Sequence, residues 1–121
     1  MASNRKVMVL PGDGIGVEVM AANLQLVDWL VKHKSLAFDI SEDQVGGAAY
    51  DSYGTPLRDE TLADAMASDA VLFGAVGGPK WDVTSENERP ENGILRIRKE
   101  LDLFSNIRPV KVYKDLVYAS P

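Results

Sequence analysis

Cysteine is absent from this 121-residue chain, and histidine occurs once, at His33. Without cysteine the chain can form no disulfide and can supply no thiolate nucleophile, a composition that fits a reducing cytoplasm. His33 falls near the end of an expected helix, where an exposed or dipole-stabilised histidine is far commoner than a catalytic one. These scarcities exclude thiol chemistry and argue against histidine catalysis by this segment.

Basic tracts and long apolar runs are also missing. The net charge is −5, and the sequence contains no cluster of Lys and Arg residues. Neither nucleic acid nor an anionic membrane surface is therefore an expected partner. No apolar stretch approaches the roughly 20 residues that span a bilayer, and the apolar run near the start is too short for a signal peptide. The length suits one domain with one core. We therefore expect a water-soluble, cytoplasmic protein.

What the chain does contain is an alternation of strand-like and helix-like segments. Short apolar runs at Lys6–Leu10 and Ala70–Ala75 are typical of buried strands, and the alternating Ala37–Val45 predicts a less buried one. Helical spacing of apolar residues predicts a helix over Ile15–Lys34, and the acidic start of Asp59–Ala67 predicts a second. Strands alternating with helices indicate an α/β protein with a mainly parallel sheet and flanking helices.

The last third of the chain extends this series. After a turn at Asn92 and Gly93, good helix formers predict a helix over Ile94–Leu101, and a strand is expected near Ile107–Val112. The segments between elements, 46–56 and 76–92, are expected to be loops. Because the end at Tyr118–Pro121 looks like the beginning of a connection and not a terminus, we expect the chain to be cut there.

The loop Pro11–Gly16 (PGDGIG) follows the first strand and opens a helix, where nucleotide-binding glycine loops also lie. Its glycines, Gly12, Gly14 and Gly16, do not form the GxGxxG of a dinucleotide fold, and no lysine followed by Ser or Thr marks a phosphate loop. No acid stands about 20 residues later, where a Rossmann unit places one. We therefore predict a tight turn in which Asp13 caps the following helix.

The loop GAVGGPKWD follows the strand Ala70–Ala75, at the position where open α/β sheets bind ligands. Gly77 and Gly78 would let a planar group approach the backbone closely. Trp81 can stack on a ligand or cover the core, and covering is the commoner role for a tryptophan. Other carboxylates show no ligand-like convergence, so no metal site is predicted in this chain. They are Asp39, Glu42, Asp43, Asp64 and Asp69.

The stretch RPENGILRIRKELDLFSNIRP contains an apolar pair and two arginines at instructive spacing. Ile94 and Leu95 precede Arg98 by one helical turn, so the three side chains can face one pocket. Arg108 follows on a segment that the next residue, a proline, keeps extended. A guanidinium can grip a carboxylate through two hydrogen bonds, and an aliphatic pair can cover a short alkyl branch. The pattern suits a small branched dicarboxylate, while the alternative is a merely solvated helix face.

Four segments, in this order, resemble the N-terminal third of the 3-isopropylmalate dehydrogenases of leucine biosynthesis. The related isocitrate dehydrogenases share PGDGIG and the paired arginines but have Ser and Asn where this chain has Glu91 and Ile94. An aliphatic pair suits an isopropyl group and would leave a third carboxylate poorly solvated. The four segments are Val9–Val19, Val45–Leu57, Ala70–Trp81 and Arg89–Lys111.

The resemblance implies a role for each matching residue. Arg98 and Arg108 would hold the malate carboxylates, and Ile94 and Leu95 would pack on the isopropyl branch, with Ile94 standing where Leu is usual. Glu91 would lie between the substrate and the nicotinamide. The NAD site would be lined by Ile15, Gly77, Gly78, Pro79, Lys80, Trp81 and Glu91.

The resemblance also implies a reaction, the NAD-dependent oxidative decarboxylation of 3-isopropylmalate to 2-oxoisocaproate. Hydride would leave C2 for NAD and the C3 carboxylate would then be lost, with Mg²⁺ or Mn²⁺ polarising the C2 oxygen. The family's third substrate arginine, catalytic tyrosine and lysine, and metal-binding aspartates have no match in residues 1–121. We therefore expect the N-terminal part of the larger domain of a homodimeric enzyme, inactive alone and with no catalytic or metal-binding residue of its own.

Two other functions stay open at this point. One is another β-decarboxylating dehydrogenase, acting on tartrate, homoisocitrate or isocitrate, although residues 91–95 favour isopropylmalate. The other is a non-catalytic binding module that has kept only the α/β scaffold, since a fold does not by itself fix a function.

Overall fold

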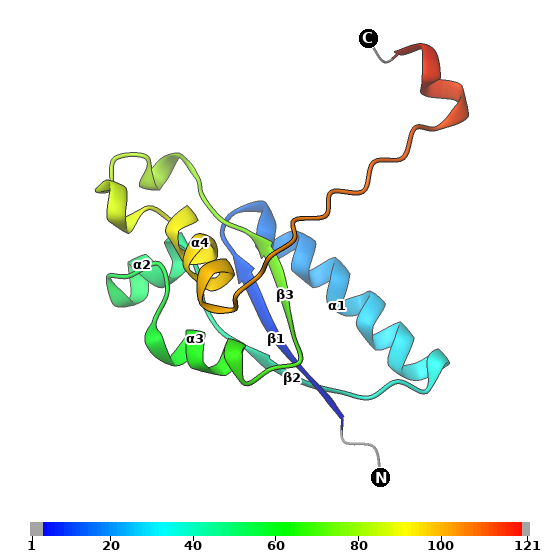
Figure 1. The fold of residues 1–121 in the computed structure, drawn as a ribbon, viewed down its shortest axis with the longest axis horizontal. Coiled ribbons are helices and arrows are strands. Elements are labelled where there is room, and N and C mark those ends of the chain that lie inside the picture. Colours follow the sequence, from blue (N-terminus) through cyan, green and yellow to red (C-terminus); the bar gives the residue numbers. More distant parts are fainter. Residues whose placement is uncertain (1–3, 120–121) are drawn as a thin grey trace.

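The computed structural model describes residues 4–119 and contains one parallel sheet (Figure 1). Its strands are β1 (Arg5–Gly12), β2 (Phe38–Glu42) and β3 (Ala70–Ala75), in the spatial order β2-β1-β3. Helices lie in the connections between the strands, since parallel pairing needs a long crossover from one strand to the next. The predicted α/β class with a mainly parallel sheet is confirmed, and the strand at 70–75 has the predicted bounds.

Helices cover both faces of the sheet. On one side lies α1, which contacts β1 and β3, and the other α-helices gather on the opposite side (Figure 1). None of the helices formed by residues 4–119 combines the length and apolarity that a bilayer-spanning segment needs. The α-helices are α1 (Ile15–Lys34), α2 (Gly47–Tyr53), α3 (Asp59–Met66) and α4 (Glu91–Glu100), and the short 3₁₀ helices are η1 (Pro79–Trp81), η2 (Glu86–Glu88) and η3 (Lys114–Ala119).

The main core lies between the sheet and the helices α3 and α4. Successive side chains of a strand point to opposite faces, so Met8 and Leu10 of β1 enter this core while Val9 is buried on the α1 side. Ile97 reaches the core from α4, which fixes that helix over the sheet. The other buried members are Val45, Leu57, Leu62 and Ala65.

The α1 layer is much less well covered. The predicted bounds of this helix are confirmed, but only Gly16 and Met20 are buried, and Val19, Leu26 and Trp29 stay 44%, 55% and 47% exposed. A three-stranded sheet is too narrow to cover the whole apolar side of a 20-residue helix. The helix therefore presents apolar surface to any further layer of the fold.

Two expected boundaries in the helical layer are wrong. The segment 46–56 is not all loop but contains α2, which forms despite its Gly and Asp content because tertiary contacts override weak propensity. Asn92 and Gly93 are not a turn but lie in the first turn of α4. Gly93 is required for close packing, since a Cβ there would stand 2.8 Å from the Pro56 carbonyl oxygen.

The strands also differ from their expected bounds. β1 continues through Pro11 to Gly12, where Gly12 still pairs with Ala75 of β3. Proline is tolerated there because the pairing with β2 has already ended at Val9 and Glu42, so no ladder bond needs its missing N–H. β2 is shorter than predicted and mostly exposed, as its alternating pattern indicated.

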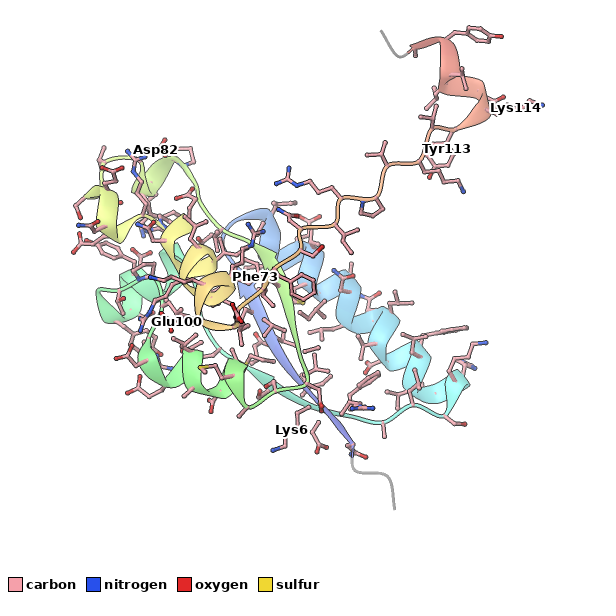
Figure 2. The ribbon with its side chains drawn as sticks, in the orientation of Figure 1. Lys6, Phe73, Asp82, Glu100, Tyr113 and Lys114 are labelled. Carbon is pink, nitrogen blue, oxygen red and sulfur yellow. The ribbon has the colours of Figure 1, made fainter. Side chains whose placement is uncertain are left out.

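The strand expected at 107–112 does not form. This segment is exposed and has no paired neighbour among the described residues, and a strand needs a neighbour to satisfy its N–H and C=O groups. Figure 1 shows it leaving the body of the fold, and Figure 2 shows Tyr113 and Lys114 far from Phe73 of the sheet.

Ionic contacts join the helical layer. The Asp43 carboxylate, just after β2, accepts hydrogen bonds from the Arg58 guanidinium at 2.7 Å and from the Thr61 hydroxyl of α3 at 2.5 Å. Burial alone would raise the pKa of Asp43, but the bonds from Thr61, the Gln44 amide and Arg58 outweigh it and hold the pKa below its usual value. Asp43 therefore ties the end of β2 to α3 as a carboxylate.

We expect the stability that Asp43 contributes to disappear in acid. Because the pKa is lowered in the folded state, the contribution is complete above the unfolded value, near 3.8, and is lost as the pH falls through the lower folded value. Asp43→Asn should cost about 1–3 kcal/mol at pH 7 and progressively less below pH 3.8. Unfolding midpoints across this pH range test it, and an equal loss at every pH would contradict the assignment.

We also expect residues 1–121 alone to be weakly stable or to associate. β3 has one neighbour among the described residues, and the outer side of α1 is apolar and uncovered, so both surfaces favour association. Chemical denaturation with analytical sedimentation is the measurement. A monomer with one cooperative transition and an ordinary stability of ~5–15 kcal/mol would show that this chain is a complete domain.

Candidate functional site

Asp13 lies at the carboxyl end of β1 and is 4% exposed. Its carboxylate accepts three backbone hydrogen bonds, from Gly47 and Ala48 at 2.7 Å each and from Gly77 at 3.0 Å. The prediction that Asp13 caps the helix following it is wrong, because Gly14 precedes α1 and no side chain caps that helix. Asp13 instead caps α2 and binds the loop after β3.

The glycine turn that contains Asp13 is explained by packing. The turn closes through the Gly16 N–H and the Asp13 carbonyl oxygen at 2.8 Å, which confirms the predicted tight turn. Gly12 has a φ of +79°, and a Cβ on it would collide with the Ala75 carbonyl oxygen. The glycines therefore allow the end of β1 and the start of α1 to lie directly against the end of β3.

The loop after β3 meets the first residue of α4 at this same edge of the sheet. Gly77 has a φ of +105°, a conformation that side-chain-bearing residues rarely adopt. A Cβ built on Gly77 would stand 2.6 Å from Oε1 of Glu91, so the Glu91 carboxylate rests on the space a side chain would fill. The fold thus brings together two residues that the sequence assigned to one site from distant positions.

Lys80 and Trp81 are bound by α2. Lys80 Nζ lies 2.5 Å from Asp51 Oδ2, and the Trp81 indole N–H donates to Asp51 Oδ1 at 3.2 Å. The hydrogen bonds from Lys80 and then from Trp81 lower the pKa of Asp51. The Trp81 ring packs against Gly47, where a Cβ would collide with it. Trp81 therefore packs on the start of α2 and is not a member of the main core.

A cleft of about 170 Å³ opens beside this loop. Three of the predicted cofactor residues line it, namely Gly78, Trp81 and Glu91, together with Asp82, which Figure 2 labels, and two residues before α4. Ile15, at the start of α1, is 61% exposed and lies outside this lining, as do Gly77, Pro79 and Lys80. The volume suits one part of a dinucleotide and not the whole.

The substrate residues predicted on α4 lie on its outward side. Ile94 is half-buried, Leu95 is 55% exposed, and Arg98 is exposed and forms no ion pair within residues 4–119. Arg98 lines a second cleft, of about 250 Å³, whose other walls are residues 103–107. Ile94 and Leu95 are not in the lining of this cleft.

Arg108 and Arg96 lie differently from expectation. Arg108 is exposed on the extended segment and is not in the lining of the Arg98 cleft, so the two arginines are not brought together by residues 4–119. Arg96 is not merely solvated, because it donates to Asp59 at 2.6 Å and to the Leu57 carbonyl oxygen at 3.4 Å. Arg96 thus joins α4 to the start of α3, and Arg98 is the arginine left available.

The residues do not assemble a metal centre of their own. Within residues 4–119 no three His, Cys, Asp or Glu side chains converge where they could hold an ion. The divalent ion implied by the resemblance therefore does not fit ligands from this segment, since such ions take several oxygen ligands.

Two carboxylates organise this edge in ways that the sequence does not predict. Asp13 binds the start of α2 and not that of α1, and Asp51 binds Lys80 and Trp81. A signal for Asp13 was present, because an acid between two glycines at the end of a buried strand is placed where backbone N–H groups converge. Asp51 gave no such signal, since its partners lie 29 and 30 residues away in a loop.

Comparison with known proteins agrees with this architecture. Residues 6–121 match the family model described as isocitrate/isopropylmalate dehydrogenase. A 3-isopropylmalate dehydrogenase of Ruegeria pomeroyi is 55% identical over 94% of the chain and 31% of its own length. One of Rhodospirillum rubrum is 53% identical over 99% of the chain and 33% of its own length. The chain thus spans about a third of the length of these relatives.

Solved structures give the same result at lower identity. A β-decarboxylating dehydrogenase from Thermococcus kodakarensis is 33% identical, with a TM-score of 0.65 over 82% of this chain and 27% of that one. An isocitrate dehydrogenase from Methylococcus capsulatus is 25% identical, with a TM-score of 0.66 over 83% and 26%. Since the family model covers nearly every residue that forms the sheet and the clefts, the chain belongs to the isocitrate/isopropylmalate dehydrogenase family.

Proposed function

We propose that this chain is a segment of an NAD-dependent 3-isopropylmalate dehydrogenase. The observation that supports this most is the contact of Glu91 with Gly77, because it joins the helix proposed to bind substrate to the loop proposed to bind cofactor. The relatives that cover nearly all of this chain at 50–55% identity bear the name 3-isopropylmalate dehydrogenase. Homodimer formation, a place in leucine biosynthesis and a cytoplasmic location belong to the same proposal.

The substrate side of the site is the outward surface of α4. Arg98, free of internal ion pairs among residues 4–119, offers two parallel N–H groups to a malate carboxylate. Ile94 and Leu95 stand one turn earlier and offer an aliphatic surface for the isopropyl branch. Arg108 would join them only when its extended segment is held against the rest of the enzyme.

The cofactor side is the edge formed by Gly77, Gly78 and Glu91. The space beside Gly77 is taken by Glu91 Oε1 and the space beside Gly78 by the Trp81 ring, and the small cleft lined by Gly78, Trp81 and Glu91 suits one part of a dinucleotide. NAD, when bound, supplies the hydride acceptor for the oxidation of C2. Glu91 is the first residue of α4 and its carboxylate lies beside Gly77, so it can orient both the cofactor and the substrate. Lys80 and Trp81 serve the site by fixing the loop to α2 through Asp51.

The reaction as a whole needs groups that this segment does not contain. Oxidation removes a hydride from C2 and a proton from its hydroxyl, and decarboxylation then breaks the bond between C3 and its carboxylate. No residue among 4–119 is placed here as the proton-transfer group, and no step is assigned to a metal ion. Residues 1–121 therefore supply binding and orientation, which are worth large factors in rate only together with the reacting groups.

We expect purified residues 1–121 to show no dehydrogenase activity. The described residues hold no metal centre, and half of the proposed substrate grip, Arg108, lies apart from Arg98. The assay follows NADH absorbance with isopropylmalate, NAD and Mg²⁺, against a full-length relative as positive control. Formation of NADH above the protein-free background would show that the segment is itself an enzyme and would contradict this division of roles.

Within a full-length enzyme that contains this segment, Arg98 should matter far more than Arg96. Arg98→Lys keeps the charge but loses the two-pronged grip on a carboxylate, so kcat/KM for isopropylmalate should fall by roughly 30- to 1,000-fold. Arg96→Lys, which can keep its ion pair with Asp59, should change kcat/KM by less than about threefold.

Steady-state kinetics on both variants make the comparison, with isopropylmalate, isocitrate, homoisocitrate and tartrate as alternative substrates. Equal effects of the two substitutions would mean that the charged face of α4 is only solvated. A preference for one of the other three acids in the unmodified enzyme would move the proposal to another β-decarboxylating dehydrogenase. Turnover of none of them would favour a binding module.

A further inference from the structure

We propose that Asp13 is a positioning residue for the cofactor edge. Its carboxylate holds the backbone of Gly77 in the conformation on which Glu91 rests, and so sets the distance between the proposed NAD loop and the substrate helix. The inference rests on the proposed function for the identity of the cofactor. The geometry itself, a buried acid bound to the main chain of two separate segments, is a property of the described fold.

The three hydrogen bonds of Asp13 divide between the two segments. Oδ1 accepts from Ala48, while Oδ2 accepts both from Gly47 and from Gly77. One oxygen is therefore shared between the start of α2 and the loop after β3, so the same carboxylate restrains both segments. An anion suits this point because N–H groups from a helix start and a loop converge on it.

Gly77 needs such a restraint. With a φ of +105° it occupies a region in which glycine is stable but not confined, since glycine also populates negative φ freely. The bond from its N–H to Asp13 selects one of these conformations. Because Glu91 Oε1 lies against the Cα of Gly77, the selected conformation also fixes where that carboxylate can stand.

The plainer alternative is that Asp13 only stabilises the fold by capping α2. Asp43 provides the matched comparison. It is a half-buried acid just after the carboxyl end of β2, and it is bound to Arg58 and to Thr61 of α3 in the same helical layer. Asp43 makes no hydrogen bond to the loop after β3. Replacement of either acid should thus lower the stability of the fold, whereas only replacement of Asp13 should weaken NAD binding at the cofactor edge.

The experiment uses a full-length enzyme that contains this segment and three variants, Asp13→Asn, Gly77→Ala and Asp43→Asn. For each we would measure the Kd for NAD by calorimetry, the KM values for NAD and for isopropylmalate, and the thermal midpoint. Asparagine keeps the shape of Asp13 but turns one acceptor into a donor facing N–H groups. Gly77→Ala keeps Asp13 and the N–H bound to it but disfavours the φ of +105° and places a Cβ 2.6 Å from Glu91 Oε1, so it disturbs the same loop conformation and serves if Asp13→Asn folds poorly.

We expect Asp13→Asn and Gly77→Ala each to raise the Kd and KM for NAD by about tenfold or more, and the KM for isopropylmalate by less than about threefold. Asp43→Asn should lower the thermal midpoint and leave all three constants within about twofold. The positioning role is overturned if Asp13→Asn lowers the midpoint without the selective loss of NAD affinity, or if Gly77→Ala binds NAD normally. An unmodified enzyme that binds NAD but does not oxidise isopropylmalate overturns the proposed substrate alone, and one that does not bind NAD overturns both.

Discussion

The carboxylate of Asp13 is the interaction on which the arrangement of the site depends. It gathers three N–H groups at the carboxyl end of β1, and through them it joins the central strand to the start of α2 and to Gly77. A buried charge is costly unless its hydrogen-bonding capacity is met, so this cluster is stable only when all three segments are in place. The tight packing of Gly12 against Ala75 brings Asp13 to that point.

The second constraint is the narrowness of the sheet. Three strands suffice to seat α3 and α4 on one face, where Ile97 anchors the helix that holds Arg98 and Glu91. They do not suffice to cover α1 or to pair the segment that contains Arg108. Residues 4–119 therefore bring Gly78, Trp81 and Glu91 to one cleft, whereas Arg98 and Arg108 do not line a common one among the clefts described above.

The sequence was a good guide wherever local chemistry decides. The helix at 15–34 and the strand at 70–75 have the predicted bounds, because apolar periodicity and flanking glycines determine them. Helix α2 could not be predicted from its own residues, since its first N–H groups are bound by an acid 34 and 35 positions earlier. The pairing of Arg96 with Asp59 and the meeting of Glu91 with Gly77 likewise arise from tertiary packing. For the candidate site, the sequence indicates the types of residue that form it but does not indicate which of those residues contact one another.

The order β2-β1-β3 has a consequence for folding during synthesis on the ribosome. Of the three strands, the central strand β1 is synthesised before the other two. It can pair with β2 early, but it can pair with β3 only after α1, β2, α2 and α3 have been synthesised. Until Ala75 has emerged, the apolar residues Met8–Leu10 have one open edge and Asp13 lacks its bond to Gly77. Pairing of β1 with β3 is thus a non-local event, of the kind that slows folding.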